Sequence, residues 1–139
     1  MKRFLTCVRG QGVLLLTAIV LFFSFPVLVW AGELRLTRAL TCLGIKDREP
    51  VGESSTFPPS TKRVFCFTDI EAASGPSEIR HVWYFSGKKV HEFSVPVKSF
   101  RWRTWTSKNI FPAQTGPWRV DVVETSSQKV IGSVQFVVK

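Results

Sequence analysis

Residues 78–97 read EIRHVWYFSGKKVHEFSVPV. Large side chains occupy every second position of the first half: Ile79, His81, Trp83 and Phe85. This period of two is typical of a β-strand with one buried face. The Ser86-Gly87 step predicts a tight turn, after which residues 89–97 return as an antiparallel strand. Pro96 removes a hydrogen-bond donor, so we expect this second strand to lie at a sheet edge or to contain a bulge.

The rest of the chain outside its N-terminus has the same character. Five further segments have strand composition: 34–45, 63–70, 101–108, 117–124 and 129–139. Residues 47–62 are rich in Pro and Gly and join two strands without a helix. About seven strands predict an all-β, antiparallel β-sandwich of immunoglobulin-like architecture, with a small barrel as the alternative. Both later cysteines precede Trp83, so the Cys-Trp-Cys order of antibody domains is absent.

The N-terminus has the layout of a secretory signal. Three cations, Lys2, Arg3 and Arg9, precede the apolar run 13–25. Pro26 and small residues up to Ala31 then favour cleavage. The alternative is an uncleaved hydrophobic anchor helix, because the apolar run through Ala31 approaches the roughly 20 residues that span a bilayer. Either way, we expect residues 1–31 to be a signal peptide or membrane anchor. Residues 32–139 then form a single exported, periplasmic or otherwise extracytoplasmic domain, which stays at the inner membrane if the anchor is kept.

The net charge of residues 32–139 favours some classes of binding partner over others. The whole chain carries a net charge of +9, and removing the three N-terminal cations leaves +6. Outside the cytoplasm, this balance favours anionic lipid headgroups or cell-envelope polysaccharide over nucleic acid. The alternative is that the charge serves only solubility.

Two cysteines remain in the exported part, Cys42 and Cys66. An oxidising compartment makes a disulfide between them plausible, and it would stabilise the fold by roughly 3 kcal/mol. The alternative is two buried free thiols, because both residues lie in strand-like segments.

Known catalytic and metal-binding patterns are absent from the sequence. There is no HExxH, CxxC, GxSxG or phosphate-binding loop, and only two histidines. We therefore expect a non-catalytic protein with no metal and no cofactor. His81 shares a face with Trp83, which favours a half-buried structural histidine; a ligand-binding role is the alternative.

RWRTWTSK (101–108) is the strongest candidate for a binding surface. Strand alternation places Trp102 toward the core, and Arg101, Arg103 and Trp105 on the opposite face. A ring beside two guanidinium groups suits an anionic sugar, with His81 as a neighbour. The alternative is that both arginines simply stack on Trp105. We hypothesise a binding module for an anionic or carbohydrate envelope component; the alternative function is a protein-interaction or structural domain of an envelope assembly.

Several segments together resemble a known family. They are DREP (47–50), RVFCFTDI (63–70), HVWYF (81–85), RWRTWTSK (101–108), GPWRVDVV (116–123) and VIGSVQFVV (130–138). Their order resembles the bacterial domain of unknown function 2914 over about residues 38–139. The resemblance implies these signature positions: His81, Trp83, Trp102, Arg103, Ser107, Lys108, Gly116, Trp118 and Arg119. It implies an exported or membrane-tethered β domain and no particular activity.

Overall fold

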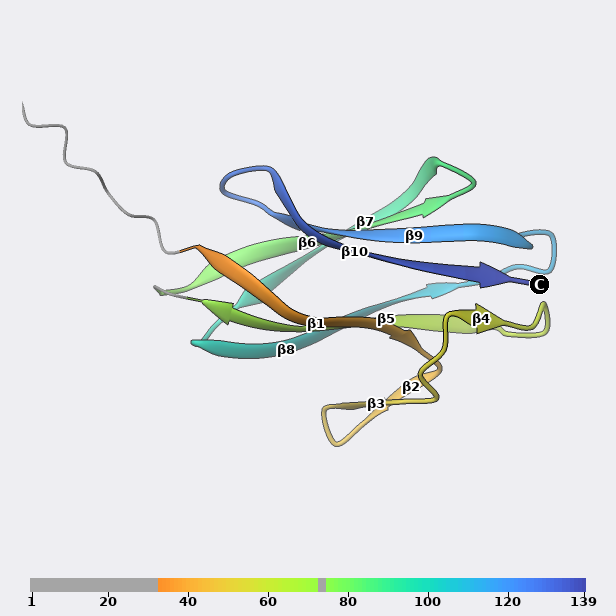
Figure 1. Ribbon diagram of the computed structural model, residues 1–139, viewed down its shortest axis with the longest axis horizontal. Coiled ribbons are helices and arrows are strands. Elements are labelled where there is room, and N and C mark those ends of the chain that lie inside the picture. The colour runs from red at the N-terminus through yellow and green to blue at the C-terminus, as the bar shows by residue number, and fades with distance from the viewer. Residues whose placement is uncertain (1–32, 73–74) are drawn as a thin grey trace, which may run out of the picture.

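The chain forms ten β-strands in the part that the computed structural model describes, residues 33–72 and 75–139 (Figure 1). Their bounds are β1 Leu34–Cys42, β2 Gly44–Lys46, β3 Glu49–Val51, β4 Thr56–Phe57, β5 Arg63–Ala72, β6 Ser77–Phe85, β7 Lys88–Val97, β8 Arg101–Asn109, β9 Gly116–Glu124 and β10 Lys129–Val138. The prediction of an all-β fold is confirmed. Within these same residues, no helix is long and apolar enough to cross a membrane. The predicted signal or anchor helix, residues 1–31, lies outside the described residues.

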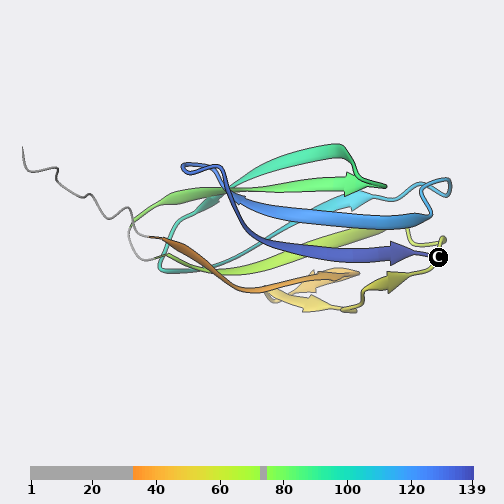
Figure 2. The ribbon, with the colours of Figure 1, turned by 45° about the horizontal axis from the view of Figure 1, so that its top comes forward.

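Two sheets lie face to face (Figures 1 and 2). One has the strand order β1-β5-β8 and the other the order β4-β10-β9-β6-β7; the hairpin β2-β3 lies beside the first sheet. All pairs are antiparallel except β4 and β10, which run parallel over two residues. The expected count of seven strands was too low, because the segment predicted as a loop contains β3 and β4, and the first predicted strand breaks at Leu43 into β1 and β2.

Alternating apolar residues of both sheets form the core between them. Trp83 and Trp118 are buried and pack with Phe57, Val64 and Phe136. The Trp118 and Phe136 rings stack with centroids 5.6 Å apart. The inward face predicted for residues 79–85 is correct, because Ile79, His81 and Trp83 are all fully buried. Burial of a large side chain contributes about 1.5–3 kcal/mol, so this double layer is the main source of stability.

The hairpin of β6 and β7 confirms the predicted turn. Ser86 and Gly87 join the two strands with φ angles of 48° and 80°. Two positive φ angles match the twist of the flanking strands. β7 is the last strand of its sheet, so Pro96 lies on an edge strand as predicted.

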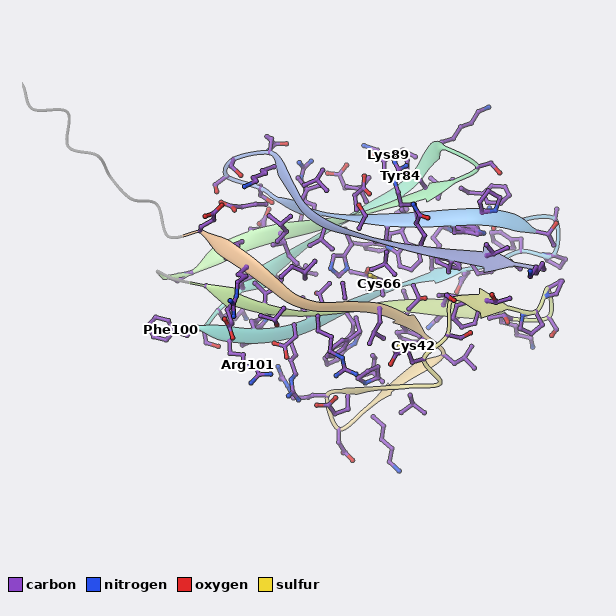
Figure 3. The ribbon with its side chains drawn as sticks, in the orientation of Figure 1. Cys42, Cys66, Tyr84, Lys89, Phe100 and Arg101 are labelled. Atoms are coloured by element: carbon purple, nitrogen blue, oxygen red, sulfur yellow. The ribbon has the colours of Figure 1, made fainter. Side chains whose placement is uncertain are left out.

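The predicted Cys42–Cys66 disulfide is absent from the structure, and both cysteines are buried free thiols. In the ladder of β1 and β5, Cys42 of β1 is paired with Phe65 of β5, whereas Cys66 of β5 is paired with Thr41 of β1. Since neighbouring residues of a strand point to opposite faces, the two thiols lie on opposite sides of one sheet. Figure 3 shows Cys66 between the two sheets and Cys42 on the side of β2 and β3. Burial raises the pKa of both thiols.

Candidate functional site

The predicted binding residues lie on the outer face of the three-stranded sheet. Arg101, Arg103 and Trp105 of β8 pair across the strand boundary with Glu71, Asp69 and Phe67 of β5. The next residue, Thr106, is buried between the sheets. The division of RWRTWTSK into two faces is therefore present in the structure.

Both arginines on this face have carboxylate partners. Arg101 donates from Nη2 to Asp69 Oδ2 at 2.9 Å and from Nε to Asp69 Oδ1 at 3.3 Å. Arg103 contacts Asp69 Oδ2 at 3.5 Å through Nε, and its Nη1 donates to Glu49. The hydrogen bond from Arg101 holds the pKa of Asp69 below its ordinary value. A new anion at this face would have to compete with carboxylates already in place.

The two tryptophans of the segment are both half-buried. Trp105 packs against the cluster of Leu40, Cys42 and Phe67 beneath the β2-β3 hairpin. Trp102 packs against the core cluster of Leu34 and Ile70, so the predicted core contact is present, although the ring is not enclosed. Among the described residues, the cation beside these rings is Arg48, whose guanidinium lies 5.5 Å from the Trp102 ring centroid. The proposed stack of Arg101 and Arg103 on Trp105 is not the arrangement found.

His81 lies between the sheets, away from the surface. Its Nδ1 is 2.8 Å from Thr106 Oγ1, and its Nε2 is 3.2 Å from Thr68 Oγ1. Trp83 Nε1 donates to Thr106 Oγ1, and the Thr68 hydroxyl donates to the Thr104 carbonyl.

One tautomer of His81 satisfies all four of these contacts. The Thr68 hydroxyl uses its proton on Thr104, so it accepts from Nε2–H of His81, and the Thr106 hydroxyl donates to Nδ1. The ring is neutral, and burial lowers its pKa to about 4. His81 therefore joins β6 to β5 and β8, and it does not reach the face of Arg101 and Trp105.

The remaining signature positions near the C-terminus have structural contacts. Gly116 has a φ angle of 129°, which side chains rarely adopt. Trp118 donates from Nε1 to the Gln114 carbonyl at 3.2 Å. The Arg119 guanidinium lies 4.3 Å from the Tyr84 ring centroid and pairs with Asp121 at 3.0 Å. Gly116, Trp118 and Arg119 therefore each have a structural role in this part of β9.

A second candidate site lies at the open edge where β7 and β8 face each other. An open groove of about 260 Å³ is lined by Arg63, His91, Phe93, Ser107, Lys108, Asn109 and Phe111. We call these residues the β7–β8 groove. Arg63 donates from Nε to Asn109 Oδ1 at 3.0 Å, and Lys108 Nζ donates to the Asn109 carbonyl at 3.4 Å.

The β7–β8 groove differs from the Arg101 face in its charge balance. None of the residues that line it is acidic, and neither Arg63 nor Lys108 forms a salt bridge within the described part of the chain. Aromatic rings stand beside the cations: His91 and Phe93 have centroids 4.2 Å apart, and Lys108 Nζ lies 5.7 Å from the Phe111 centroid. An ammonium, a guanidinium, a hydroxyl, an amide and exposed rings suit an anionic sugar.

Of the residues in this groove, Ser107 and Lys108 alone were predicted from the sequence, as signature positions. Arg63, His91 and Phe111 come from three separate segments, and no spacing rule joins them. The available signal was the absence of acids near Arg63 and Lys108 in the sequence. Their proximity to His91 depends on how the two sheets pack.

Among the described residues, no group of three His, Cys, Asp or Glu side chains is placed to hold a metal ion.

Comparison with known proteins gives one family. The model of the family described as "Protein of unknown function (DUF2914)" matches residues 76–138, which confirms the predicted resemblance over β6 to β10. All the signature positions lie within this range, whereas residues 47–50 and 63–70 precede it. No match to a curated protein was found.

Proposed function

We propose that this protein is an exported, non-catalytic binding module for an anionic or carbohydrate component of the cell envelope. The N-terminal segment supports export, and the family match brings no catalytic assignment with it. We propose further that the fold is an immunoglobulin-like sandwich. The orders β1-β5-β8 and β10-β9-β6-β7 correspond to strands A-B-E and G-F-C-C′ of that architecture.

The charge balance of the β7–β8 groove carries this proposal. Arg101 and Arg103 already pair with Asp69 and Glu49, so an incoming anion gains little there. Within residues 33–72 and 75–139, the partners of Arg63 and Lys108 are an amide and a carbonyl, which an anion can replace with stronger charge-assisted hydrogen bonds. We therefore propose that the binding site is the β7–β8 groove. The arginines of the surface predicted from sequence serve to stabilise the fold instead.

A charge-reversal experiment tests the groove. Arg63→Glu combined with Lys108→Glu removes two cations, and we expect binding of an anionic envelope glycan to weaken at least about tenfold, since each such contact contributes about 1.5–3 kcal/mol. The measurement is isothermal titration with lipopolysaccharide or cell-wall fragments, with a neutral glycan as the ligand control.

The matched control is Arg35→Glu combined with Lys98→Glu, which changes the net charge equally at exposed positions outside the groove. Equal weakening in both double variants would mean that only net charge attracts the ligand. No binding by the wild type, together with specific protein adducts after crosslinking in intact cells, would favour the alternative function of a protein-interaction domain.

A further inference from the structure

One end of the molecule carries an exposed aromatic side chain without a packing role in the core. Phe100, between β7 and β8, is 75% exposed, the largest exposed fraction among the large apolar side chains that the structure describes. Lys98 and Ser99 beside it are also exposed. Figure 3 shows Phe100 at the tip of the molecule, next to Arg101.

The same end receives the chain from its apolar N-terminal segment. Leu34, the first residue of β1, pairs with Ala72 of β5, and the Ala72 amide donates to the Phe100 carbonyl at 2.8 Å. Adjacent strands are about 4.8 Å apart, so Phe100 lies roughly 10 Å across the sheet from Leu34. The views in Figures 1 and 2 both place the start of β1 and the start of β8 at this end.

The link between the apolar segment and β1 is short. The apolar run ends at Ala31, and only Gly32 and Glu33 separate it from Leu34. The three residue steps from Ala31 to Leu34 span at most about 11 Å. If the run through Ala31 enters a bilayer, the end that carries Phe100 is held at the lipid surface.

Three ion pairs at this end are each neutral overall. Arg35 pairs with Glu71, Arg101 with Asp69, and Lys129 with Glu33. These pairs leave the Phe100 ring as the group that gains most from leaving water. Lys98 has a long apolar stem, which lets its ammonium group stay in the headgroup layer while the ring goes deeper.

We propose that residues 13–31 are retained as the anchor, the second of the two possibilities given above, and that this end of the molecule rests on the bilayer they enter, with the Phe100 ring below the lipid headgroups. The β7–β8 groove then faces away from the membrane. Arg63 and Ala72 are the two ends of β5, whose ten residues extend roughly 30 Å. This orientation is independent of which ligand the groove binds.

Site-specific photo-crosslinking of the full chain tests the proposal. A benzophenone amino acid replaces Phe100 in one variant and Phe111, 58% exposed at the other end of the sheet, in the control variant. Membranes from cells that express each chain are irradiated, and adducts are identified by mass. We expect lipid adducts at position 100, several-fold above position 111.

Equal lipid labelling at both positions overturns the proposal. So does labelling at position 100 by protein alone, or a chain that appears only in the soluble fraction without lipid adducts. Glycan titration on the wild-type chain and on the position-100 variant, which lies outside the groove, separates this proposal from the proposed function, because loss of lipid labelling leaves binding at the β7–β8 groove unaffected.

Discussion

His81 and Trp83 show how single residues hold the two sheets together. Both side chains come from β6 and meet Thr106 of β8 across the core, and His81 also meets Thr68 of β5. Sequence alternation correctly predicted that both point inward. It did not predict their hydroxyl partners, because Thr68 and Thr106 belong to the other sheet and no local pattern joins them to β6.

The buried neutral ring of His81 predicts a loss of stability in mild acid. Its pKa is about 4 in the fold, against about 6.5 when unfolded, so the unfolded chain binds the extra proton first. Stability is unaffected by this group above pH 6.5, falls between pH 6.5 and 4, and loses roughly 3 kcal/mol in total. Urea denaturation at several pH values measures this.

The exposed histidine supplies the control. His91→Gln should keep the wild-type dependence on pH, whereas His81→Gln should flatten it between pH 6.5 and 4. An unchanged slope in His81→Gln would show that another group causes the loss. The hydrogen bond from Arg101 lowers the pKa of Asp69. Asp69 therefore adds to the loss of stability only at lower pH, below the ordinary pKa of an Asp side chain.

At the scale of elements, one of the two short hairpins was predicted from the sequence and the other was not. The β6-β7 turn contains Gly87 and was predicted. The β2-β3 turn uses Asp47 and Arg48 with φ angles of 51° and 62°. Asp is common at the first of these positions, but the second usually carries Gly, so the turn was missed because Arg48 stands there. Contacts from Arg48 to the Arg103 carbonyl and the Trp102 ring accompany its conformation.

Gly87 and Gly44 provide a test of backbone conformation alone. A Cβ added at either glycine meets no atom within 4 Å, but only Gly87 has a positive φ angle, of 80°. Gly87→Ala should destabilise the fold by about 1 kcal/mol, because an L side chain disfavours this conformation. Gly44→Ala should be close to neutral. Thermal denaturation of both variants decides, and equal effects would contradict the backbone explanation.

At the scale of the whole molecule, the layering of two sheets decides the state of the cysteines. Cys42 and Cys66 lie on opposite sides of one sheet, so a bridge would require the ladder of β1 and β5 to break. The separation of the two cysteines along the chain and the oxidising compartment had made a disulfide plausible. The register of β1 and β5 excludes this disulfide, because it places the two side chains on opposite faces of the sheet.

The buried thiols lead to a labelling prediction. Alkylation of the folded protein should leave Cys42 and Cys66 unmodified, and alkylation after denaturation without reductant should label both. Burial raises the pKa of both thiols, which lowers their reactivity further. Peptide mass spectrometry distinguishes these two sites from Cys7. A disulfide-linked peptide in the non-reduced digest would contradict the structure.

The sequence by itself determined the all-β class, the inward face of β6 and the family resemblance, because these depend on local alternation and on residues close together in the chain. Only the tertiary structure decided which cations are free to bind. Arg101 and Arg103 meet carboxylates from β3 and β5, whereas Arg63 and Lys108 meet none in the part of the chain that the structure describes. Charge pairing depends on which strands become neighbours, and that is set by the packing of the whole fold.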